Sequence, residues 1–241
     1  SVSGGSYGLK ETALKAGAAG RSGDIYVTGG SGSSDGFQQN SALSRDSASA
    51  RAGLDLGRAG RLSLSGLFSR QRTGLPSGTP VPAADWDGSA ERAANSLTDW
   101  QRSRRETGSL SWSGGSPALE LRADGSLSSN FMEALQYGSV TRARVTDRTL
   151  SLRATLYGSA VAGAESTASS LDSAVYGDHS VNSAGFFAQK TFKPAAGLEL
   201  TPAARYDRNG TYDGRVSPEF SAVYSPDGRW KLSAAAGRAF Q

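Results

Sequence analysis

Charged side chains spaced two residues apart are the chemical groups that stand out in this chain. Glu120, Arg122 and Asp124 alternate with leucine and alanine in the run 119–127. Successive side chains of a β-strand point to opposite faces, so this spacing places three charges on one face. Charges are costly to bury in an apolar core. The charged face therefore contacts water, and the leucine face contacts an apolar medium. The same spacing is found at Arg153, Glu199, Arg205 and Asp207.

The sequence contains no combination of residues that is typical of a catalytic or metal-binding site. The chain has one histidine, His179, and no cysteine. A Ser-His-Asp triad would have to use His179, which lies in a polar segment with no nucleophile elbow. Asp35 and Asp46 are too few for a calcium site, which takes six to eight oxygen ligands. The glycine-rich segment 29–36 lacks the lysine of a phosphate-binding loop. We predict no enzyme, no cofactor and no metal site.

The composition limits which elements can hold these charges. Of 241 residues, 37% are hydrophobic and 31 are glycine, a thin supply for a soluble core. Either much of the chain is disordered, or the fold needs no packed apolar interior. A barrel with a wet lumen requires only every second strand residue to be apolar. The net charge of +4 is spread among interleaved acidic residues, so no nucleic-acid partner is expected.

Alternating runs of about ten residues recur along the chain. In the closing segment 216–241, two such runs flank a Pro-Asp-Gly turn, which is typical of a β-hairpin. Strands of this length cross a bilayer when tilted. Short turns (20–23, 58–60, 114–117, 157–159, 194–197, 226–228) alternate with longer polar segments (31–47, 73–100, 130–145, 167–180, 208–215). The pattern predicts an all-β fold, part of a transmembrane antiparallel up-and-down β-barrel of which about thirteen strands are present.

Residue order in three segments adds a family resemblance. The closing hairpin reads SP-x-x-x-x-VY-x-P from Ser217 to Pro226 and then GRAF at 237–240. This order resembles the barrel of TonB-dependent outer-membrane receptors. Segment 4–17 is similar to the family's early barrel strands, and 186–207 to a mid-barrel hairpin. The layout most resembles the cobalamin and siderophore receptor branch.

The resemblance also defines what is missing from the chain. Family members carry an N-terminal plug domain and a TonB box, and their barrels have about 22 strands. Neither the plug nor the box is found here, and the family continues beyond GRAF. We therefore expect residues 1–241 to be a partial barrel domain without its plug and C-terminal strands. A further strand should follow residue 241, because an unpaired edge inside a membrane is unfavourable.

Three arginines and two tryptophans are the candidate ligand-binding residues. Arg122, Arg153 and Arg205 would face the lumen, where they contact a substrate or plug, or are paired by neighbouring strands in water. Trp86 and Trp100 lie in the longest irregular segment. They stack on a ligand, or they pack the loop or mark a membrane interface. The residues alone leave both alternatives open.

Aromatic residues beside the short turns have a separate expected role. Trp112, Phe192, Tyr224 and Trp230 would form the membrane girdle on the periplasmic side. The resemblance implies a protein of the bacterial outer membrane, surrounded by its lipid. Its implied function is energy-dependent uptake of a scarce small-molecule or metal-chelate ligand, such as siderophore-iron or cobalamin. The TonB energy-transducing complex would act through the missing plug.

Three rival functions remain at this stage. A passive porin-like channel has nearly the same barrel chemistry, and a plug encoded upstream would distinguish the receptor from it. A binding or adhesive barrel would not transport. A soluble or extracellular β-rich protein would leave membranes without detergent. Loop composition does not identify the ligand.

Overall fold

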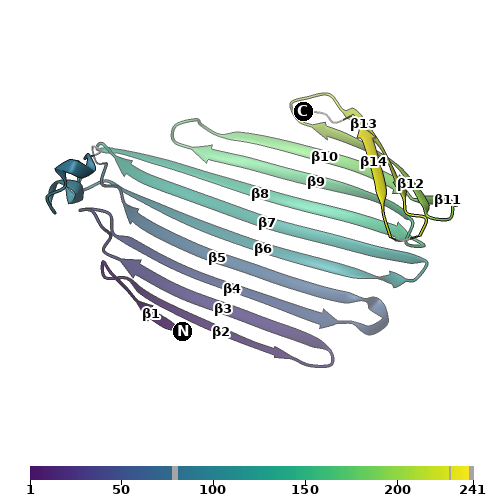
Figure 1. Ribbon diagram of the computed structural model, residues 1–241, viewed down its shortest axis with the longest axis horizontal. Coiled ribbons are helices and arrows are strands. Elements are labelled where there is room, and N and C mark those ends of the chain that lie inside the picture. The colour runs from purple at the N-terminus through teal and green to yellow at the C-terminus, as the bar shows by residue number, and fades with distance from the viewer. Residues whose placement is uncertain (78–80, 228, 239–241) are drawn as a thin grey trace.

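The computed structural model describes residues 1–77, 81–227 and 229–238, and it is built from one antiparallel β-sheet (Figure 1). Within the described ranges the sheet has fourteen strands. Their bounds are β1 Val2–Gly4, β2 Lys10–Ala19, β3 Gly23–Ser34, β4 Leu43–Asp55, β5 Arg61–Gly74, β6 Trp100–Ser116, β7 Leu119–Gln136, β8 Ser139–Leu156, β9 Ala160–Ser173, β10 His179–Lys190, β11 Phe192–Ala195, β12 Leu198–Asn209, β13 Arg215–Tyr224 and β14 Leu232–Gly237. Three 3-10 turns, η1 Gly57–Ala59, η2 Ala83–Asp85 and η3 Ala90–Arg92, lie in the connections.

Apart from the short β11, the strands pair in the order in which they follow one another in the sequence, which confirms the up-and-down order. Thirteen strands follow one another across the sheet from β1 to β14, and the short β11 pairs with β12 beside that path. Within the described residues no pairing joins β14 to β1, so the sheet is open. The turn residue Gly228 and the last two residues of the GRAF run, Ala239 and Phe240, lie outside the described residues.

Connections alternate between two ends of the sheet. At the short-turn end the chain turns at 20–22, 56–60, 117–118 and 157–159, close to the predicted positions. At the opposite end, here called the long-loop end, lie 35–42, 75–99, 174–178 and 210–214. The connection 75–99 is the longest of these and stands out at one side of Figure 1.

The predicted loop at 130–145 is wrong. Strands β7 and β8 each continue for eighteen residues and meet in a two-residue turn at Tyr137–Gly138. Both turn residues have positive φ, 51° and 78°, as a type I′ hairpin requires. Because about ten residues suffice to cross a bilayer, these strands extend well past that length.

The cross-strand register defines two faces of the sheet. We call the face that holds Glu120, Arg122 and Asp124 the enclosed face, and the opposite one the open face. Along β12 the enclosed-face residues are half-buried, whereas Pro202 and Tyr206 on the open face are exposed. Polar residues dominate the enclosed face and leucine is common on the open face. The two faces therefore have the chemistry that the alternation predicted.

Helices contribute little to this architecture. Each 3-10 turn has three residues, and no helix of the described residues is long and apolar enough to cross a membrane. Ala134 and Val161 are the hydrophobic residues that are buried in the described part of the chain. The sheet therefore has no packed apolar core of its own.

Candidate functional site

Ion pairs on the enclosed face cross over glycines. Arg205 on β12 reaches Glu165 on β9 at 2.9 Å, and Gly185 of the intervening β10 lies beneath the pair. Arg45 pairs with Glu11 in the same way, across β3. Second-neighbour strands are about 9.5 Å apart, so the bridge needs a long arginine and an intervening residue without a side chain. The enclosed face is thereby tied together over three strands at a time.

The glycines leave no room for a larger residue. A Cβ atom built on Gly185 would lie 2.6 Å from the Arg205 Nη2 and 2.7 Å from an Asp207 carboxylate oxygen. A third glycine, Gly53 of β4, lies beneath the pair between Arg61 and Asp24. This arrangement could not be predicted from the sequence, because nothing in one strand shows which glycine lies opposite which charge.

All three predicted lumen arginines belong to the enclosed face. Arg122 and Arg153 are direct cross-strand partners on β7 and β8. Arg122 donates from Nε to Asp124 at 2.8 Å, whereas Arg205 is shared between Glu165 and Asp207. In the described part of the chain Arg153 has no carboxylate partner. It is the one of these three arginines whose guanidinium is open to another anion.

Two further arginines on this face were missed. Arg51 of β4 faces Tyr26 and Ser65, and Arg105 of β6 faces Ser69 and Asn130. Neither side chain forms an ion pair with a described residue. Their positions among the polar residues of an alternating strand are the sequence signal that could have identified them. A guanidinium presents five donors in a planar fork, which suits carboxylate and similar anions.

The two candidate loop tryptophans are not close to these arginines. Trp86 lies at the end of η2, is 57% exposed, and donates from Nε1 to the Val81 carbonyl at 3.0 Å. Trp100 is the first residue of β6 and belongs to the open face, where Arg72 and Arg102 lie over its ring. Hence the structure brings Arg122 and Arg153 together and leaves both tryptophans apart from them.

The long connection 75–99 is fixed to the neighbouring connection 35–42. The Asn40 side-chain nitrogen lies within hydrogen-bond distance of the carbonyls of Leu75, Ser96 and Asp99, at 3.3, 3.1 and 2.8 Å. Asp99 is 2% exposed and accepts a hydrogen bond from the backbone of Tyr137 in the β7–β8 turn. The long-loop end is therefore a joined rim of three connections.

Within that rim, Asp87 organises the turn that precedes Arg92. One carboxylate oxygen of Asp87 accepts hydrogen bonds from the backbone nitrogens of Ser89 and Ala90, each at 2.8 Å. Hydrogen bonds to the charged form favour it. The backbone donors of Ala90 and Ser89 lower the pKa of Asp87 to about 2.

Metal-binding groups do not gather in the described part of the chain. No three His, Cys, Asp or Glu side chains there are arranged to hold an ion. The single histidine, His179, uses its Nε2 to donate to the Tyr176 carbonyl at 2.7 Å. Asp46 is paired with Arg70.

The aromatic residues of the proposed girdle do lie at the short-turn end. Trp112 donates from its indole nitrogen to the Ala59 carbonyl at 2.9 Å. Tyr224 and Trp230 meet edge to face, with ring centroids 5.8 Å apart. Phe192 is 45% exposed at the start of β11.

An apolar belt covers the short-turn half of the open face. Its leucines are between 48% and 74% exposed and come from five strands: Leu14, Leu64, Leu110, Leu127, Leu150 and Leu152. So large an exposed apolar area marks contact with a membrane or a partner.

An antiparallel up-and-down sheet with a polar enclosed face and an exposed apolar belt is the wall of an outer-membrane-type β-barrel. The family model described as TonB dependent receptor-like, beta-barrel, matches residues 3–241, and the chain belongs to this family. No curated protein matches the sequence. The described fold and the family therefore agree.

Solved structures show the same fold. The siderophore receptor PirA from Pseudomonas aeruginosa is 14% identical, with a TM-score of 0.71 over 97% of this chain and 40% of that one. The ferric-catecholate import receptor Fiu from E. coli K12 is 13% identical, with a TM-score of 0.71 over 98% and 49%. For the ferric citrate transporter FecA the identity is 13% and the TM-score 0.66, over 95% and 41%. The chain spans less than half the length of these receptors.

Proposed function

We propose that this chain forms part of the barrel of a bacterial outer-membrane receptor that imports a scarce ligand. In this proposal the enclosed face lines the lumen, the joined rim faces the outside, and the apolar belt contacts lipid. Residues 1–241 then belong to a larger barrel. A plug fills its lumen, and a TonB-type complex supplies the energy.

The opposite chemistry of the two faces carries this proposal. On β7 the even-numbered residues from Glu120 to Asn130 are charged or polar, while Leu119, Leu121 and Leu127 belong to the other face. A sheet in water gains nothing by exposing leucines at 48% or more over several strands. A lipid-facing belt and a wet lumen account for both faces together. Membership of the receptor family adds the transport role.

A metal chelate or comparably polar molecule is the ligand class that we propose. The similar structures named above are a siderophore receptor, a ferric-catecholate import receptor and a ferric citrate transporter. Their identities of 13–14% support the fold, so siderophore-iron and cobalamin both remain within the proposal. Arg51, Arg105 and Arg153 are the proposed anion contacts in the lumen, because none is neutralised by a described carboxylate.

We propose two roles for the aromatic residues, one at the short-turn end of the sheet and one at the long-loop end. Trp112, Phe192, Tyr224 and Trp230 form the girdle at the periplasmic interface, where amphipathic rings are favoured. At the outer rim, Trp86 is the exposed aromatic that contacts an arriving ligand. Trp100, expected in a loop where it would stack on a ligand, lies between two arginines on the open face, so we do not propose it as a ligand contact.

Uptake by the intact receptor tests the function. The full-length gene is deleted and restored, and uptake of ferric siderophores and of cobalamin is measured with radiolabelled ligand, with and without a protonophore. We expect restored cells alone to take up one ligand class, and the protonophore to abolish the uptake. Uptake that survives the protonophore would identify a passive channel. Binding without uptake would identify an adhesive barrel.

A further inference from the structure

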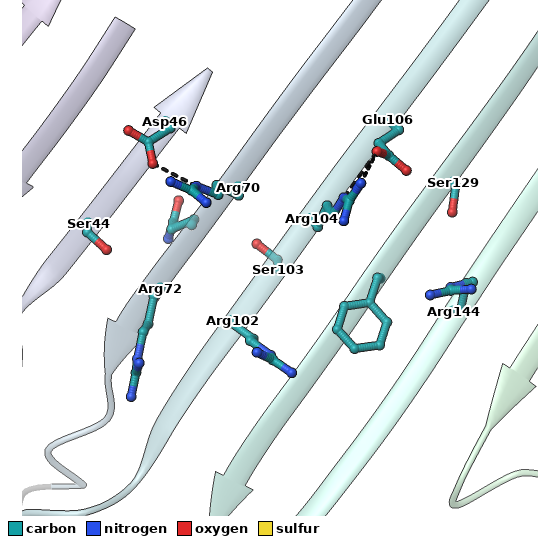
Figure 2. A pocket seen from close by; sticks show the side chains of 12 residues that line it. Ser44, Asp46, Arg70, Arg72, Arg102, Ser103, Arg104, Glu106, Ser129 and Arg144 are labelled. Carbon is teal, nitrogen blue, oxygen red and sulfur yellow. Dashed lines mark hydrogen bonds and ion pairs between the residues drawn. The ribbon is translucent and has the colours of Figure 1, made fainter. Parts of the chain in front are cut away.

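A cluster of arginines covers the open face on the long-loop side of the apolar belt, where the proposed lumen function does not use it. A groove of about 580 Å³ lies there across strands β4 to β8 (Figure 2). Its lining has five arginines and two carboxylates, a net charge of +3. The arginines are Arg70, Arg72, Arg102, Arg104 and Arg144, and the carboxylates are Asp46 and Glu106.

The arginines are placed against one another across β5 and β6. Arg72 is the direct cross-strand partner of Arg102, and Arg70 is the partner of Arg104. Like charges directly opposite on neighbouring strands are destabilising. The sheet therefore holds a repulsive arrangement that a bound anion would relieve.

Internal ion pairs neutralise only part of this charge. Arg70 donates to Asp46 at 2.8 Å and Arg104 pairs with Glu106, as the dashed lines of Figure 2 show. Arg102 pairs with Glu133, which lies outside the groove lining. In the described part of the chain, Arg72 and Arg144 form no ion pair, although Asp172 of β9 is the direct cross-strand neighbour of Arg144. The donors of these two guanidinium groups are therefore not committed to a carboxylate.

Each of these two guanidinium groups lies close to an aromatic ring of the neighbouring strand. The Arg72 guanidinium carbon lies 5.2 Å from the centre of the Trp100 ring, and that of Arg144 lies 5.5 Å from the Phe131 ring. Arg102 lies within 6 Å of both rings, so arginines and rings alternate across four strands. Stacking of this kind orients a guanidinium while its edge donors stay free.

The height of the cluster above the belt indicates which ligand fits. Arg144 is paired with Phe131, four residues beyond Leu127 of the belt. At about 3.3 Å per residue and a tilt of about 40°, this is about 10 Å of height. The headgroup layer of a simple phospholipid is only about 6 Å thick on each side. A phosphate carried on a headgroup of sugars has the required height.

We infer that this arginine cluster binds the phosphates of a sugar-bearing lipid in the outer leaflet, and that Arg72 and Arg144 are its principal contacts. The inference rests on the proposed location in the outer membrane. Belt and cluster lie on the same face of the same strands, so one lipid molecule can contact both. Its acyl chains would lie along the leucines and its phosphates would reach the arginines.

Binding of lipopolysaccharide to the intact receptor tests the inference. The full-length protein in mild detergent is titrated with lipopolysaccharide whose inner core is phosphorylated, and with the same material after enzymatic dephosphorylation. We expect the double variant Arg72→Gln/Arg144→Gln to bind the phosphorylated form about 30-fold more weakly, and each single variant about fivefold. Arg72→Lys/Arg144→Lys should recover part of the affinity. High salt should weaken binding, because exposed charges are screened.

The matched control is a double variant that removes the same two positive charges from the enclosed face. Arg51→Gln/Arg105→Gln removes two arginines of the enclosed face and should leave lipid affinity unchanged. Equal losses in both double variants, or equal affinity for the dephosphorylated lipid, would overturn the inference. Full displacement by millimolar inorganic phosphate would show a free-anion site and would equally overturn the lipid assignment. Membrane fractionation and ligand uptake by the wild type and by Arg72→Gln/Arg144→Gln separate this result from failure of the proposed function.

Discussion

At the scale of single residues, glycine decides whether charges on the enclosed face can meet. Arg205 and Glu165 belong to strands that are not neighbours, and they meet above Gly185. Arg205 is also held by Asp207 at 2.8 Å. The position therefore combines a steric requirement with an electrostatic one.

The substitution Gly185→Val tests this arrangement. A Cβ there would come within 2.6 Å of the Arg205 guanidinium, so valine must displace it and separate the ion pair. We expect the free energy of unfolding to fall by about 1–3 kcal/mol, the usual cost of inserting extra carbon atoms into a filled site. Urea unfolding of the full-length protein in detergent, followed by tryptophan fluorescence, measures it.

The control is Gly125→Ala on the open face of β7. A Cβ on Gly125 would meet no atom within 4 Å. Because glycine within a strand is less favourable than alanine by about 0.5–1 kcal/mol, stability should stay equal or rise. If Gly185→Val were as stable as this control, the steric role of Gly185 would be refuted.

A pH dependence is expected at Asp87. Its pKa is lowered to about 2 by hydrogen bonds from Ala90 and Ser89, against a usual value of 3.8. A carboxylate with a lowered pKa stabilises the folded form above its usual pKa, and this contribution is lost as pH falls through the lowered value. The turn 87–92 should therefore stay ordered above about pH 4 and loosen between pH 4 and 2. Hydrogen–deuterium exchange of this segment, corrected for the intrinsic rate, should show the change in the wild type and not in Asp87→Asn.

At the scale of elements, Asn40 connects the two longest connections of the rim. The change Asn40→Asp keeps the shape and the tolerance for the positive φ of 53° but removes the amide donors. The two N–H donors shared among three carbonyls are then lost, and a carboxylate is placed against those carbonyls. We expect the opening free energy of 75–99 to fall by about 1–3 kcal/mol. Limited proteolysis of intact outer membranes should cut this loop faster, with the barrel unfolding unchanged.

Gln39→Glu is the matched control for that substitution. It adds the same charge at the adjacent residue and keeps the oxygen that accepts from the Ala94 backbone. Its loop should be cut at the wild-type rate. Equal acceleration in both variants would assign the effect to charge and not to the Asn40 hydrogen bonds.

Element order and turn positions could be predicted from the sequence, because period-two alternation and short Gly-containing turns are local signals. The turn at Tyr157–Gly158 was found in this way. The extension of β7 and β8 through 130–145 was not. Its open-face residues, Phe131 and Glu133 among them, are not uniformly apolar, so the alternation weakens while the strand continues. Glu133 is buried between Arg102 and Arg142, and this cross-strand pairing replaces the hydrophobic pattern there.

At the scale of the whole molecule, the sheet has a polar face and a face with an apolar belt, and few of its described residues are buried. Backbone pairing along fourteen strands satisfies the polar main chain, which is the requirement for crossing a bilayer. The shared face of seven charged residues could be predicted from the sequence: Glu120, Arg122, Asp124, Arg153, Glu199, Arg205 and Asp207. The partners of Arg205 and the isolation of Arg153 could not, because they depend on register between strands. Trp100 was assigned to a loop because its neighbours are irregular, yet it begins a strand.

The most direct test of a barrel wall with one lipid-facing and one water-facing side is to measure whether alternate residues of β7 contact lipid or water. Because the chain has no cysteine, single cysteines can be introduced at Leu121, Leu127, Ser126 and Ser128 of the full-length protein and spin-labelled in bilayers. Labels at Leu121 and Leu127 should collide with oxygen dissolved in lipid, and labels at Ser126 and Ser128 with a water-soluble nickel chelate. Equal exposure of all four positions to the nickel chelate would contradict a barrel wall whose open face contacts the membrane.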